Sequence, residues 1–143
     1  MSTHTEGARR RARELLFRLA YQADLMGERY ANVWKTAREG EHLSADQLEL
    51  IDDVMKLLEG RSAEVDEIVG RAAQHWELER LAATDRSVLR TATAELLSRP
   101  GTPVRVVLDE AIDIAKRFGS EESGRFVNGV LDRVARALRP EEL

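Results

Sequence analysis

The segment TPVRVVLDEAIDIAKRFG, residues 102–119, carries a complete set of helix signals. Thr102 is a favourable N-cap, and Pro103 suits the first helical position because its missing N–H would have no partner there. Apolar residues then recur every three or four positions, as one buried face of a helix requires. Lys116 and Arg117 lie in the last turn, and Gly119 indicates the C-terminal stop. The segment is therefore expected to form an amphipathic helix over residues 103–118.

The same type of signal extends along the chain in both directions. Ser44 and Gln47 form a capping box at the start of another apolar run. No stretch combines period-2 alternation with β-branched residues, so no strands are predicted. We expect an all-α fold of about seven helices in two packed helical subdomains. The expected helices span residues 8–26, 28–38, 44–60, 62–73, 84–98, 103–118 and 120–138.

The length of 143 residues fits a single domain. We expect one domain over residues 1–143, with an N-terminal helical half at about 8–74 and a C-terminal half at about 75–139. Residues 1–7 and 140–143 are expected to be flexible termini, because chain ends are poorly ordered unless they are anchored.

The composition removes several classes of function. There are no cysteines, which excludes disulfides, thiolate zinc sites and a cysteine nucleophile. His4, His42 and His75 are too far apart in sequence for a local metal pair. No phosphate-binding or nucleophile-elbow motif occurs, so we predict no enzyme, no catalytic residues, no cofactor and no metal. The chain shows no membrane-length apolar run or signal-peptide core, which predicts a cytoplasmic protein with no membrane partner.

The net charge of −4 hides a basic segment at the amino end. Residues 1–18 hold five arginines against two glutamates, a balance of +3 that leaves −7 for the rest of the chain. Four of these arginines lie within residues 9–13. Such a cluster on an acidic protein favours an anionic partner, although arginines also serve on solvated helix faces.

On a helical projection Arg10, Arg13, Phe17 and Tyr21 fall near one stripe, and Arg9 lies one turn from Arg13. Guanidinium groups bind phosphates and stack on bases, which suits single-stranded nucleic acid. Phe17 is more typical of a core residue, whereas Tyr21 suits either role.

The start of the last expected helix contains a second group of this kind. Arg125 is a natural second basic contact. Gly124 and Gly129 each cost about 1 kcal/mol relative to alanine inside a helix, so each needs a reason. Close approach of two helices would explain Gly129, and access for a ligand or partner would explain Gly124.

Several runs of this sequence resemble the family of the transcription antitermination factor NusB. The resemblance extends from Ala8 to Arg139, with the looser part at residues 28–75. The runs that carry it are ARRRARE at 8–14 with Tyr21, DRSVLR at 85–90 with ELL at 95–97, DEAIDIAKRFG at 109–119 and RFVNGVLD at 125–132.

The resemblance implies an RNA-binding antitermination factor. With NusE, a small-subunit ribosomal protein, such factors bind boxA RNA of nascent rRNA transcripts and join a complex on RNA polymerase that suppresses premature termination. The NusE-facing surface would include Tyr21 and Asp85.

The chain departs from the usual family pattern at Ala94, Asp109, Glu122 and Gly124. The implied RNA contacts are Arg9, Arg10, Arg13, Glu122, Arg125 and Phe126.

The leading hypothesis requires the amino-terminal arginines and the start of the last helix to form one continuous surface. The alternative is a helical protein-interaction module that forms a homodimer and masks the arginine arm. The small residues of the 84–98 helix and the acidic body of the protein motivate that alternative.

Overall fold

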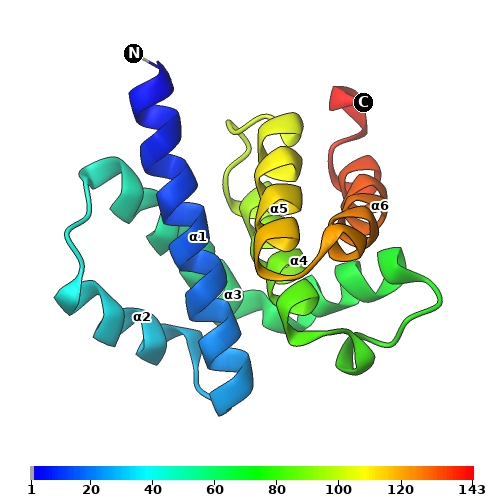
Figure 1. Ribbon diagram of the computed structural model, residues 1–143, viewed down its shortest axis with the longest axis horizontal. Helices are drawn as coiled ribbons and strands as arrows, with labels where there is room; N and C mark the ends of the chain where they lie inside the picture. Colours follow the sequence, from blue (N-terminus) through cyan, green and yellow to red (C-terminus); the bar gives the residue numbers. More distant parts are fainter. Residues whose placement is uncertain (1) are drawn as a thin grey trace.

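The computed structural model describes residues 2–143, with side chains from Gly7 onward, and every regular element in this part of the chain is helical (Figure 1). The predicted all-α class is therefore confirmed. None of the described helices has the length and apolar character needed to cross a bilayer. The elements are α1 (Ser2–Met26), α2 (Tyr30–Gly40), α3 (Ala45–Ala73), α4 (Ala83–Ser98), α5 (Val104–Phe118) and α6 (Glu121–Leu138), with short 3-10 turns at Leu78–Arg80 and Pro140–Glu142.

The boundary expected between helices 44–60 and 62–73 is a kink inside α3. Only Arg61 leaves helical dihedral angles there, with φ −134° and ψ 32°. Glycine and serine weaken a helix but keep the backbone N–H that proline lacks, so they do not end it. Leu58 and Val65 are fully buried on either side of the kink, and their packing holds both halves in one element. The described chain thus has six α-helices, close to the expected number of about seven.

The first helix begins at Ser2, six residues before the expected start at Ala8. Met1 and the side chains of residues 2–6 lie outside the described part of the structure, so the expected flexibility of the amino end stays a prediction.

The helix α4 occupies the centre of the fold, where it packs against α1, α3, α5 and α6. Its small side chains Ala92, Thr93 and Ala94 are buried, which lets the neighbouring helices approach closely. The small residues of this segment therefore line the core. This corrects the expectation that they offer a surface for a homodimer.

Two predicted helix starts have different outcomes. The capping box at Ser44 is confirmed, since its Oγ accepts from Gln47 N–H and the Gln47 side chain accepts from Ser44 N–H. Thr102, in contrast, is not the N-cap of α5, because Pro103 takes that position and Val104 begins the helix. The Val104 N–H is satisfied by the carboxylate of Glu142 at 2.9 Å.

The C-terminal residues hold the loop between α4 and α5. Arg139 is 5% exposed and donates to the backbone carbonyls of Leu96, Arg99 and Thr102. Its guanidinium also contacts Glu142 at 3.1 Å. Residues 140–143, expected to be a flexible terminus, thus include a side chain that is bonded to the start of α5.

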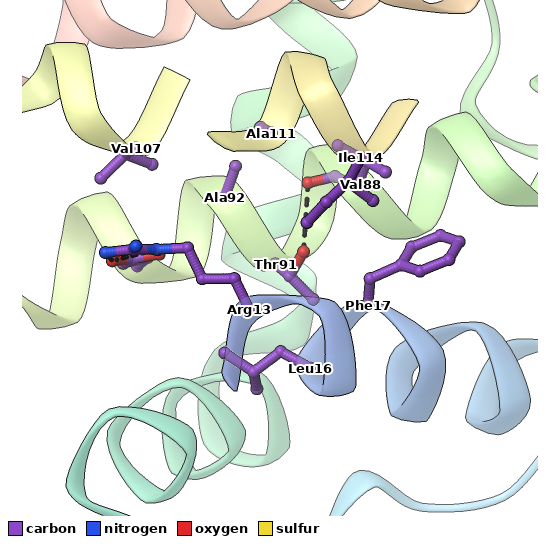
Figure 2. Close-up of a pocket in the computed structure, with 10 residues that line it drawn as sticks. Arg13, Leu16, Phe17, Val88, Thr91, Ala92, Val107, Ala111 and Ile114 are labelled. Atoms are coloured by element: carbon purple, nitrogen blue, oxygen red, sulfur yellow. Dashed lines mark hydrogen bonds and ion pairs between the residues drawn. The ribbon is translucent and has the colours of Figure 1, made fainter. Parts of the chain in front are cut away.

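A buried ion pair joins α1 to α4. Arg13 is 7% exposed, and its Nη2 lies 2.7 Å from Glu95 Oε2 while its Nε lies 2.9 Å from Oε1. Figure 2 shows Arg13 reaching from α1 toward α4, near Ala92 and below Val107 of α5. These groups border a cavity of about 20 Å³, the size of a single water. Charges removed from water are tolerated only when they are paired, so this contact fixes the position of α1.

Replacing Glu95→Gln is expected to destabilise the protein by about 3–5 kcal/mol, because Arg13 would lose the counter-charge that it contacts directly and keep only Glu110, at 3.8 Å. Urea denaturation followed by circular dichroism measures this loss. Replacing both residues, Arg13→Met with Glu95→Leu, should restore most of the stability.

The matched control is Glu64→Gln, which breaks an exposed pair with Arg61. It should lower the free energy of unfolding far less than Glu95→Gln does, because solvent screens this pair. An equally small loss for Glu95→Gln would contradict the structural role assigned to the buried pair.

Candidate functional site

Two of the predicted RNA contacts lie on α1 in ion pairs that are partly exposed to solvent. Arg9 Nε is 2.9 Å from Asp46 Oδ2, and the hydrogen bond from this guanidinium lowers the pKa of the Asp46 carboxyl. Arg10 Nη2 is 2.9 Å from Glu110 Oε2, and the Arg10 side chain is 57% exposed. Exposed pairs of this kind contribute about 1 kcal/mol or less, so a phosphate can displace the carboxylate at little cost.

Arg13 is more deeply buried than Arg9 and Arg10. Its guanidinium is enclosed by Glu95 and the core, and it also lies 3.8 Å from Glu110. Contact with RNA would require the buried pair to open, so the geometry favours a structural role for Arg13, and its expected contact with RNA stays a prediction. Its neighbour Arg11 is exposed and has no ion-pair partner among the side chains described from Gly7 onward. Sequence reasoning missed Arg11 because it lies off the stripe that runs from Arg10 to Tyr21.

The start of α6 presents three predicted contacts. Ser120 caps the helix by accepting from the N–H of Ser123 at 3.1 Å. Glu122 is exposed in the first turn, where a carboxylate is favoured by the helix dipole. Arg125 is exposed and has no ion-pair partner within residues 7–143. Phe126 is half-buried, with its ring edge-on to that of Trp76 at a centroid distance of 6.0 Å.

The two glycines of α6 have roles opposite to those expected. A Cβ added at Gly124 would lie 2.6 Å from Cγ of Lys116, so the Lys116 side chain of α5 crosses closely over this point. A Cβ added at Gly129 would meet nothing within 4 Å. Close helix packing therefore explains Gly124, whereas Gly129 leaves open space on the helix surface.

An aromatic groove of about 430 Å³ lies between α1, the start of α4 and the end of α5. The Phe17 ring lies 5.0 Å from that of Phe118 and 5.9 Å from that of Tyr21. Arg18 also lines this groove, with its guanidinium 5.4 Å from the Phe118 ring centroid. Aromatic walls with a cationic edge suit an apolar or acidic protein segment. The predicted partner contact Tyr21 lies in this groove with Thr84.

Asp85, the other predicted partner contact, directly follows Thr84 of the groove. Burial raises the pKa of its carboxyl, and a hydrogen bond from the Ser123 side chain opposes that rise. Its Oδ1 atom is buried and accepts no hydrogen bond from the described residues. A buried carboxylate oxygen without a donor is costly, so this environment disfavours the ionised form of Asp85.

The helix α5 separates the two groups of predicted RNA contacts. It packs against both α1 and α6 and lies between them in Figure 1. Arg10 pairs with Glu110 near the middle of α5, whereas α6 starts just after Phe118, which contacts Phe17. Arg10 is seven residues from Phe17, or about 10 Å along the α1 axis. The two groups of predicted RNA contacts thus lie on either side of α5, which packs against both helices that carry them.

Known proteins resemble the chain over nearly its full length. The model of the NusB family matches residues 8–136. A transcription antitermination protein NusB from Koribacter versatilis is 42% identical over 136 residues, covering 94% of this chain and 93% of the relative. One from Sorangium cellulosum is 41% identical over 132 residues, covering 92% and 94%. These relatives are named for antitermination rather than for a catalysed reaction, in agreement with the prediction that the chain is not an enzyme.

Solved structures share the fold. NusB of T. maritima aligns with a TM-score of 0.83 at 36% identity, covering 94% of each chain. A crystal structure of the antitermination factors NusB and NusE in complex with dsRNA aligns with a TM-score of 0.77 at 29% identity, covering 91% of this chain and 97% of that one. The family match, the near-complete relatives and the common fold agree, and the chain belongs to the NusB family of transcription antitermination factors.

Proposed function

We propose that this antitermination factor acts with NusE on boxA RNA of nascent rRNA transcripts in the cytoplasm, within a complex on RNA polymerase that suppresses premature termination. The observation that carries the RNA part is the pair of exposed, unneutralised guanidinium groups of Arg11 and Arg125 on either side of α5, within residues 7–143 of an otherwise acidic protein. Support for NusE comes from the related structure that holds NusB, NusE and dsRNA together.

The RNA contacts proposed on α1 are Arg9, Arg10 and Arg11. When RNA binds, Arg9 releases the carboxylate of Asp46 and Arg10 releases that of Glu110, and each then binds a phosphate. Within residues 7–143, Arg11 has no carboxylate to release. Arg13 positions these three by holding α1 in the core. On α6, Arg125 binds phosphate, Phe126 packs against a base, and Glu122 accepts hydrogen bonds from base or ribose donors.

The aromatic groove is the proposed NusE surface. Tyr21 contributes an aromatic ring with a polar edge, and Asp85 offers an oxygen that lacks a donor. A NusE segment that fills the groove and donates a hydrogen bond to Asp85 would remove the free-energy cost of the unsatisfied carboxylate oxygen. A segment without such a donor would not, which is a source of specificity.

The triple change of Arg9, Arg10 and Arg11 to alanine should weaken boxA binding and flatten its salt dependence. Each lost phosphate contact lowers the slope of log K against log salt by about 0.7 on a single strand, so a decrease of about 2 is expected for three. Fluorescence polarisation of a labelled boxA oligonucleotide at several salt concentrations measures the slope.

The matched control replaces Lys56, Arg61 and Arg71 with alanine. These cations are exposed on α3 and ion-paired, so the control removes the same formal charge elsewhere. It should leave most of the salt slope intact. Equal slopes for the two triple variants would show that only net charge matters and would exclude a defined α1 contact.

Asp85→Asn should raise Tm at neutral pH and weaken NusE binding. Burial raises the pKa of the folded carboxyl, so the folded state binds more protons than the unfolded state between the ordinary and the raised pKa. Stability therefore falls as pH increases through that window, and asparagine removes this loss at neutral pH. Below about pH 4 both states are mostly protonated, so the difference in Tm should become small.

Thermal unfolding at two pH values and a NusE titration by calorimetry test this change. Asp109→Asn is the control, because Asp109 is an exposed carboxylate on α5. A lower Tm for Asp85→Asn at neutral pH, or unchanged NusE affinity, would contradict the role assigned to Asp85.

A further inference from the structure

Trp76 is an exposed tryptophan beside the start of α6. It is 55% exposed, and the Phe126 ring packs against it at 78°. The other tryptophan, Trp34, is 5% exposed and donates its indole N–H to Asp52 at 2.9 Å. Trp34 is thus explained by the fold, whereas a large part of the Trp76 ring has no partner in the described chain.

Gly129 lies on the same face of α6 as Phe126 and Arg125, because residues three and four positions apart are neighbours on a helix. The open space at this glycine is not used by any described part of the molecule. One turn further along α6, Arg133 donates to the carbonyl of Ala72 at 2.6 Å. This hydrogen bond holds the Arg133 side chain in place at one end of the open space. A glycine within a helix is unfavourable, and packing does not account for this one.

We propose that Trp76, Phe126 and Gly129 form a site for one unpaired RNA base, with Arg125 holding an adjacent phosphate. The proposal rests on the RNA-binding function above and extends it to Trp76 and Gly129. Tryptophan and phenylalanine supply rings for stacking. Glycine lets a flat base approach the helix backbone, and the unpaired guanidinium favours a phosphate. The cation beside the open area therefore favours RNA over an apolar protein segment as its occupant.

Gly129→Ala separates a ligand role from a structural one, because it should change stability and binding in opposite directions. The added Cβ meets nothing, so better helix propensity should raise Tm by about 3–5 °C. The same methyl group occupies the base site and should weaken binding of a boxA oligonucleotide about tenfold or more. Differential scanning calorimetry and fluorescence polarisation measure the two effects.

Gly60→Ala is the matched control, since an added Cβ at Gly60 on α3 also meets nothing within 4 Å. It should leave RNA affinity unchanged. A lower Tm for Gly129→Ala would assign the glycine to packing, and unchanged RNA affinity would exclude the base site. Weakened NusE binding with unchanged RNA binding would identify a protein as the occupant and also overturn the proposal.

Tryptophan fluorescence tests stacking directly. Binding of boxA RNA should quench the Trp76 emission, whereas inorganic polyphosphate, which has no bases, should bind without this quenching. Trp76→Phe should abolish the quenching, because the remaining Trp34 is buried. Trp76→Ala should weaken RNA affinity by about 5- to 100-fold, and Trp76→Phe should recover part of it.

The outcomes separate this inference from the proposed function. RNA binding that depends on the α1 arginines but leaves Trp76 emission and the Trp76→Ala affinity unchanged would overturn the base site alone. Equal quenching by polyphosphate would also overturn stacking. Absence of any boxA binding by the wild-type protein, with and without NusE, would overturn both.

Discussion

The buried pair of Arg13 and Glu95 determines which parts of α1 reach the surface. Once Arg13 points into the core, the helical repeat of 100° per residue sets the direction of its neighbours. Arg11 is two residues away and lies on nearly the opposite side, so it faces solvent. Arg9 is one turn earlier and reaches Asp46 at the start of α3. The buried contact between Arg13 and Glu95 thus leaves one arginine of this run with a structural role and places the others at the surface.

The sequence predicts the helical class and most helix positions because the signals for them are local. A capping box, an apolar stripe and a terminal glycine act within a few residues, and they locate the start of α3 and the whole of α5 and α6 well. The predictions of helix boundaries are wrong where residues far apart in the sequence determine the local structure. Packing on both sides of Arg61 carries α3 through weak helix formers. Glu142 satisfies the first N–H of α5 from 38 positions away, a contact that no local pattern indicates.

The candidate site shows the same limit. Arginine types and spacing indicate an anion-binding helix, but the partner of Arg13 lies 82 positions away. The sequence assigned close helix packing to Gly129 and an open approach to Gly124, and the structure shows the reverse. The difference depends on where Lys116 of α5 crosses α6, which no local pattern indicates. Residue types therefore predict the chemistry of a surface, whereas its exact members follow from tertiary packing.

The two proposed binding surfaces are physically connected through Ser123. Its side chain bonds to Asp85 at the edge of the aromatic groove, and its N–H is held by Ser120, which caps α6. A donor brought by a protein partner to the free Oδ1 atom of Asp85 would act on the same carboxyl that accepts from the Ser123 hydroxyl, at the first turn of the helix that carries Arg125 and Phe126. Any effect of the partner on RNA affinity must then be matched by an equal effect of RNA on partner affinity, because coupling free energies are reciprocal. A helix cap shared by both surfaces gives that coupling a short, local route.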